Sequence, residues 1–94
     1  MRTVFLVTPE EVAKARSLEE KLIAIPPESG VLFVGVSVEP ANDLRIKPIY
    51  EVFVGCSPAM EPVAIQGLVL LLLKEEIAEG HLFRVSAHRG LSRK

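Results

Sequence analysis

The sequence predicts an α+β fold with the order strand, helix, strand, strand, helix, strand. Two segments have apolar residues at helical spacing, and four have the alternation or the short apolar run that is typical of strands. Prolines and glycines separate these segments. The 94 residues are expected to form a single domain, 1–94, with a basic C-terminal tail at about 90–94.

The first half of the chain predicts a strand, a helix and a second strand. Residues 3–7 form an apolar run typical of a buried strand. A helix is expected at 9–24, because Thr8 can cap it, Pro9 fits its first turn, and Glu11 can complete a capping box. The prolines that follow end this helix, and alternation predicts a strand at 31–39.

The second half predicts a third strand, a second helix and a fourth strand. The third strand is expected at 48–56, since Pro48 cannot donate to a ladder and suits a strand start. The helix is expected at 59–79, or from Pro62 onward, with Gly80 as its stop. The fourth strand is expected at 82–89.

Right-handed crossovers between these elements predict a ferredoxin-like split β-α-β sandwich (βαββαβ). Such a sandwich is a four-stranded antiparallel sheet, in the order 4-1-3-2, with two helices on one face. This architecture serves many functions, so function must be argued from individual sites.

The second helix has more apolar surface than a small monomer needs. At about 100° per residue, one side predicts a core stripe, which consists of Val63, Leu70, Leu73 and Ile77. The opposite side is acidic and contains Glu61, Glu75, Glu76 and Glu79. Apolar residues on an acidic, solvent-facing side indicate a partner surface. The predicted oligomer interface therefore consists of Ile65, Leu68, Val69 and Leu72.

Composition excludes several classes of function. The net charge of −1 gives no basic field that would attract nucleic acid or anionic lipid. The apolar run of the second helix is shorter than the roughly 20 residues of a membrane span. Because the single cysteine cannot form an intramolecular disulfide, a cytoplasmic location is expected.

Cys56 is a candidate nucleophile, because it ends a strand just before a helix N-terminus, where a thiol pKa can fall. His88 is expected at the same end of the sheet. However, the first strand should separate the two by about 10 Å, with Cys56 inward and His88 outward. A buried cysteine without catalytic function is the preferred interpretation. No metal or cofactor is expected, since neither these residues nor His81 have ligand spacing.

Ser57 and Arg89 form a candidate site for an anion or ligand. Backbone N–H groups at the start of the second helix could bind an anion, and Arg89 could approach from the last strand. The chain has no glycine-rich phosphate loop here, and Pro58 removes one donor. An ordinary capped helix is the competing interpretation.

The uncovered face of the sheet is expected to carry Phe33 and Phe53. Aromatic residues on such a face can stack RNA bases. The nearby Glu51 opposes phosphate, and a basic-Gly-aromatic motif is missing, so the sequence does not favour nucleic acid. A second surface for self-association explains these phenylalanines more simply.

The leading hypothesis for function is a small, soluble, homo-oligomeric module that is non-enzymatic and regulatory or ligand-binding. A small molecule could bind where two subunits meet. The alternative is a small enzyme with a site at the Cys56/Ser57 end or in a subunit cleft. An RNA-binding module is the third hypothesis.

Overall fold

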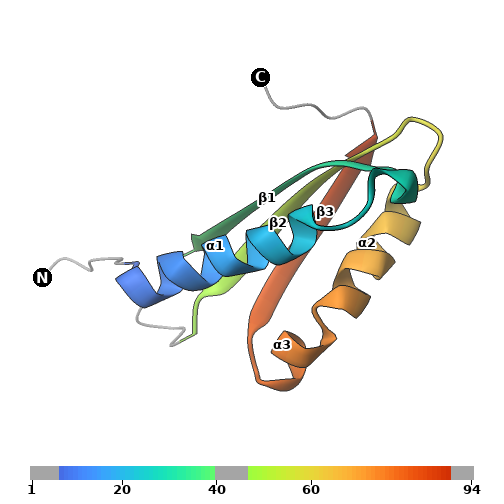
Figure 1. Ribbon diagram of the computed structural model, residues 1–94. Coiled ribbons are helices and arrows are strands. Elements are labelled where there is room, and N and C mark those ends of the chain that lie inside the picture. Colours follow the sequence, from blue (N-terminus) through green and yellow to red (C-terminus); the bar gives the residue numbers. More distant parts are fainter. Residues whose placement is uncertain (1–6, 40–46, 90–94) are drawn as a thin grey trace, which may run out of the picture.

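The computed structural model describes residues 7–39 and 47–89, and these form a sheet with helices on one face (Figure 1). The elements in chain order are α1 (Pro9–Ile23), the 3-10 helix η1 (Pro27–Ser29), β1 (Val31–Glu39), β2 (Ile49–Cys56), α2 (Pro62–Leu72), α3 (Lys74–Ala78) and β3 (Leu82–Arg89). In these residues the sheet has the order β1-β2-β3. β2 is antiparallel to β1 and parallel to β3.

The predicted ferredoxin-like, four-stranded antiparallel sheet is wrong, and only the coarse α+β class holds. β2 and β3, the predicted third and fourth strands, pair directly, with Val52 opposite Val85. No first strand can lie between them, and their parallel pairing makes the sheet mixed. The predicted strand 3–7 lies outside the described residues except for Val7, which is not in a strand.

The predicted start of the first helix is confirmed. The Thr8 hydroxyl accepts the N–H of Glu11 at 3.1 Å, and the Glu11 carboxylate accepts the N–H of Thr8 at 2.9 Å. This reciprocal capping box satisfies two N–H groups that have no partner within the helix. The prediction of 9–24 differs from α1 by one residue at its end.

The second predicted helix is two helices, because α2 ends before Leu73 and α3 begins after it. Gly80 stops α3 as predicted, and its φ of 98° is one that glycine adopts without strain. The N–H of Gly80 donates to the Ile77 carbonyl and that of His81 to the Glu76 carbonyl, both at 3.0 Å. These two bonds are those of a Schellman motif, which turns the chain into β3.

The core lies between the helices and one face of the sheet. Every second residue of β2 faces the helices, because strand side chains alternate. The fully buried side chains are Leu18, Leu22, Val52, Val54, Cys56, Ile65, Val69 and Leu73. Each large apolar side chain buried in this way contributes roughly 1.5–3 kcal/mol. The core therefore fixes which side of each helix faces the sheet.

An ion pair joins α1 to α3 across the surface of the molecule. The Lys21 ammonium lies 3.1 Å from a carboxylate oxygen of Glu76. Burial raises the pKa of Glu76, but the Lys21 hydrogen bond, a backbone hydrogen bond and nearby lysine charges outweigh burial and leave the pKa below its usual value. The pair therefore contributes stability above the pKa of the unfolded carboxyl, and this is lost as the pH falls through the lower folded pKa.

Candidate functional site

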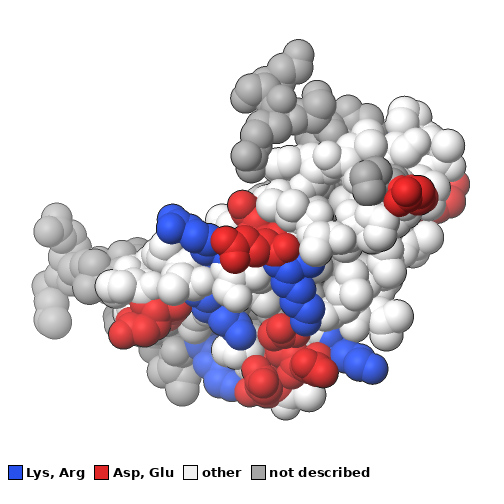
Figure 2. Space-filling model, in the orientation of Figure 1, with Lys and Arg blue, Asp and Glu red and all other residues white. Residues whose placement is uncertain are grey.

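The outer face of α2, formed by Val63, Ala64, Gly67, Leu70 and Leu71, is apolar and exposed to solvent. The exposed fraction is 77% for Val63, 61% for Leu71 and 40% for Leu70. In Figure 2, charged side chains gather over α1 and α3, whereas the surface over α2 carries few of them. A continuous apolar patch on so small a chain is typical of an interaction surface.

The orientation of α2 is opposite to the predicted one. Of the predicted interface, Ile65 (2% exposed) and Val69 (0% exposed) lie in the core of the chain itself, and Leu68 and Leu72 are half-buried. Of the predicted core stripe only Leu73 is buried, and the other three residues are exposed.

The glutamates used to orient the helix explain this error. Glu61 precedes the first turn of α2, and the other three glutamates follow its interruption at Leu73. They therefore do not mark the solvent side of α2 itself. The apolar residues of α2 that are open to solvent are those of the outer face.

Gly67 lies in the middle of the outer face of α2. A Cβ atom added there would meet nothing within 4 Å. Glycine inside a helix costs about 0.5–1 kcal/mol relative to alanine, and the packing of this chain does not require it. Glycine does allow a second backbone to approach closely. The sequence signal that could have identified this face is the position of Gly67, with Val63 four residues before it and Leu70 and Leu71 after it.

Ser57 and Arg89, the predicted anion site, do lie at the same end of the sheet, because Arg89 pairs with Cys56 in the register. Their polar groups already have partners within the chain. Arg89 lies 3.0 Å from a carboxylate oxygen of Glu61, and the Ser57 hydroxyl accepts the N–H of Ala59 at 3.3 Å. Because α2 begins only at Pro62, Ser57 caps a turn and not the helix. An anion would have to displace the Glu61 carboxylate.

Cys56 is fully buried, as expected for a core cysteine. Its thiol lies 3.6 Å from the backbone carbonyl oxygen of His88, to which it can donate. β2, which carries Cys56, and β3, which carries His88, are direct neighbours. The predicted separation of these two residues by two strand spacings is therefore wrong. His88 pairs with Gly55 and its side chain is exposed, so thiol and imidazole lie on opposite faces of the sheet, as predicted.

The face of the sheet away from the helices carries Phe33 and Phe53, as the alternation predicted. Phe33 pairs with Gly55, and Phe53 pairs with Gly35, so each aromatic residue lies opposite a residue without a side chain. This pairing covers both glycines, which are buried.

Charge on the same face is neutralised within the sheet. An Arg84 nitrogen lies 2.8 Å from a carboxylate oxygen of Glu51 and 3.4 Å from one of Glu39. These carboxylates compete with any phosphate for the guanidinium group. The arrangement therefore gives no support to RNA binding.

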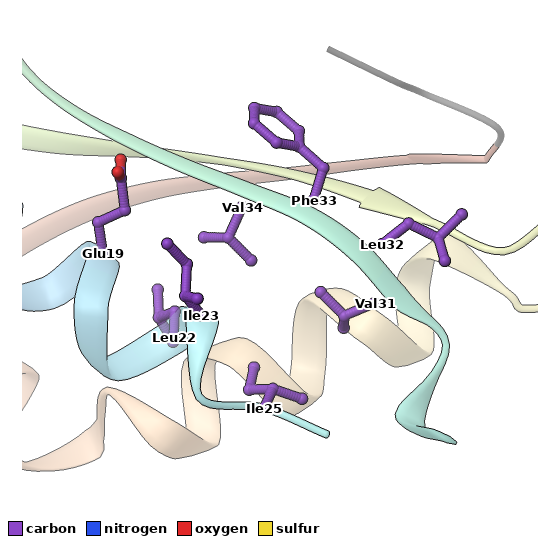
Figure 3. Close-up of a pocket in the computed structure, with 8 residues that line it drawn as sticks. All are labelled: Glu19, Leu22, Ile23, Ile25, Val31, Leu32, Phe33 and Val34. Carbon is purple, nitrogen blue, oxygen red and sulfur yellow. The ribbon is translucent and has the colours of Figure 1, made fainter. Parts of the chain in front are cut away.

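Two adjoining hollows, of about 250 and 270 Å³, lie between α1 and β1 and share Glu19. The carboxylate of Glu19 accepts the N–H of Val36 at 2.8 Å, on the side of β1 where the described residues contribute no further strand. Figure 3 shows Val34 pointing towards the helices and Phe33 pointing away from them. The other side chains in this close-up are aliphatic, so the hollow has few groups for chemistry: Leu22, Ile23, Ile25, Val31 and Leu32.

Residues 7–39 and 47–89 contain no cluster of three or more His, Cys, Asp or Glu residues that could hold a metal ion. Within the same ranges, no helix is both long enough and apolar enough to cross a membrane.

Comparison of the chain with protein-family models, curated proteins and solved structures finds no match.

Proposed function

We propose that this chain is a non-enzymatic, self-associating module in which two copies pair through the outer face of α2. The exposed, nearly charge-free surface of this helix is the observation that supports the proposal. Burying each large side chain would contribute roughly 1.5–3 kcal/mol, before the costs of association. Val63, Leu70 and Leu71 occur in both copies, so the apolar contribution is doubled.

The position of Gly67 favours an antiparallel helix pair that crosses at this residue. Val63 lies four residues before Gly67 and Leu71 four residues after it. A two-fold axis at Gly67 would therefore place Val63 of one copy against Leu71 of the other, twice. Lys74 would approach the end of the partner helix that carries Glu61, so opposite charges would meet at both ends of the interface.

Neither alternative function has comparable support. An enzyme site at the Cys56/Ser57 end would need an accessible thiol, and Cys56 is fully buried there. An RNA-binding face would need cations for phosphate, and the Arg84 guanidinium lies between two carboxylates.

Sedimentation of the full chain tests the proposed pairing. The wild type is expected to be a dimer at micromolar concentration, and the double variant Val63→Glu, Leu71→Glu is expected to be a monomer. Four buried carboxylates without partners would oppose association. Leu82→Glu is the matched control, because Leu82 is also an exposed aliphatic residue but lies on β3. A monomeric wild type, or a dimer unaffected by the double substitution, would refute the proposal.

Gly67→Ala is expected to have opposite effects on the folding stability of the single chain and on the stability of the dimer. In the monomeric double variant, the added methyl group has free space and should raise the free energy of unfolding by about 0.5–1 kcal/mol. In the otherwise wild-type chain it should weaken the dimer, because the helices could no longer approach as closely. Chemical unfolding measures the first effect and the dilution dependence of sedimentation measures the second. A stronger dimer would contradict the crossing at Gly67.

A further inference from the structure

A cavity of about 320 Å³ lies where β2 and β3 begin, and it is lined by side chains of both charges. It is assembled from α1, the residues before β2, β2 itself, and the turn between α3 and β3. The lining residues are Glu11, Lys47, Pro48, Tyr50, Glu79, Gly80 and His81. Its volume is at the small end of the range of ligand pockets.

Tyr50 is the buried polar group of this cavity. It is only 3% exposed, and its ring packs against His81 and Phe83 at centroid distances of 6.0 and 5.8 Å. Among the described residues its hydroxyl has no hydrogen-bond partner. The hydroxyl is therefore available to an acceptor atom of a ligand in the cavity.

The hydroxyl of Tyr50 is suited to donate a hydrogen bond. Burial raises the pKa of Tyr50, and the negative charge of Glu11 raises it further. The phenol therefore stays protonated well above neutral pH. Its O–H group can donate a hydrogen bond to a carboxylate or carbonyl oxygen of a ligand.

Each charged group around Tyr50 also has a contact within the chain, and the Glu79 side chain is 65% exposed. The Lys47 ammonium donates to the Gly80 carbonyl at 3.1 Å. A carboxylate oxygen of Glu79 lies 3.6 Å from Nε2 of His81. One carboxylate oxygen of Glu11 accepts the N–H of Thr8 in the capping box. These contacts leave the second oxygen of Glu11 and further donor positions of Lys47 for a ligand.

We infer that this cavity binds a small zwitterion of the size of a free amino acid. Its ammonium group would lie beside Glu11 and Glu79, and its carboxylate would accept hydrogen bonds from Tyr50 and Lys47. A simple anion would meet the two glutamates, and a simple cation would meet Lys47. Only a ligand with both charges complements the whole lining.

The single tyrosine makes the cavity directly observable. The chain has one tyrosine and no tryptophan, so its intrinsic emission reports on Tyr50 alone. Each non-aromatic free amino acid is titrated into the full chain up to about 10 mM, with emission and melting temperature recorded. The aromatic amino acids are tested by melting temperature only. At least one is expected to change the emission saturably and to raise the melting temperature, as a ligand of the native state does.

Removing either charge of the ligand is expected to weaken its binding. The methyl ester of the best amino acid lacks the carboxylate, and its N-acetyl derivative lacks the ammonium group. Each should bind at least about tenfold more weakly, because one charge-assisted interaction is lost. Equal binding by the ester would refute the roles of Tyr50 and Lys47, and equal binding by the acetyl derivative would refute those of Glu11 and Glu79.

Substitutions in the cavity test the same assignment by calorimetry. Tyr50→Phe keeps the ring and removes the hydroxyl, and Glu79→Gln keeps the shape and removes the charge. Both should weaken binding by at least about tenfold, while Glu75→Gln, which lies on α3 outside the cavity, should have no effect. If Tyr50→Phe fails to fold by circular dichroism, Glu79→Gln decides. Wild-type affinity in the variants, or no binding by any amino acid, would overturn the inference.

Discussion

Replacing Ile65 by alanine is expected to lower the free energy of unfolding by about 2–5 kcal/mol, whereas Leu71→Ala should change it by less than about 0.5 kcal/mol. Both residues are on α2, but Ile65 is in the core and Leu71 is mostly exposed. Truncating Ile65 leaves a cavity that the surrounding side chains fill only in part. Urea unfolding of the wild type and of each variant, at a dilution where sedimentation shows a monomer, measures the effect on the chain alone.

Two valines on α2 provide a matched control for this orientation. Val69→Ala and Val63→Ala remove the same atoms from the same helix, but Val69 is fully buried and Val63 is 77% exposed. Only Val69→Ala should destabilise the chain. A larger loss at Val63 than at Val69 would reverse the assignment and restore the face that the sequence predicted as the core.

Replacing Gly30 by alanine is expected to lower the free energy of unfolding by about 2–3 kcal/mol. Gly30 has a φ of 93°, which strains any residue with a Cβ atom. An added Cβ would also collide with the side chain of Met60. The Gly30 carbonyl accepts the N–H of Ser57 at 2.8 Å, so a shift of this loop would disturb the connection that leads to α2. Chemical unfolding gives the loss directly.

Gly80→Ala separates backbone strain from this collision. Gly80 has a similar φ of 98°, but a Cβ atom there meets only the end of the flexible Lys47 side chain. The expected loss is therefore smaller, about 1–2 kcal/mol. Adding Met60→Ala to Gly30→Ala should recover part of the loss, and a double-mutant cycle measures that part. Equal losses at both glycines, with no recovery, would contradict the steric argument.

Local chemistry was predictable because it depends on neighbours in the sequence. Thr8 and Glu11 form the capping box, Gly80 stops α3, and β1 and β3 have the predicted bounds. Strand pairing was not predictable in the same way, because alternation shows which residues share a face but does not show which strand lies beside another. The connection from β2 through α2 and α3 places β3 directly beside β2 and parallel to it. In the predicted antiparallel sheet, these two strands were not neighbours.

The sequence predicted the wrong buried side for α2 and did not predict the cavity, for two different reasons. A helix that is apolar on nearly all sides has no single core stripe. The prediction therefore depended on the glutamates before and after α2, and these do not mark its solvent-exposed side. The cavity groups come from three segments far apart in the sequence, which contain Glu11, Lys47 with Tyr50, and His81. They have no common spacing, and only the pairing of β2 with β3 and the packing of α1 bring them together.

The hydrogen bond between Glu19 and Val36 has a consequence for polymerisation. β1 is an edge strand of the described sheet, and an edge with open N–H groups is a template on which further chains can add. The carboxylate of Glu19 takes up one such N–H and places a negative charge beside the strand. Removing the Glu19 carboxylate would therefore have a smaller effect on the folding of a single chain than on the tendency of many chains to form fibrils.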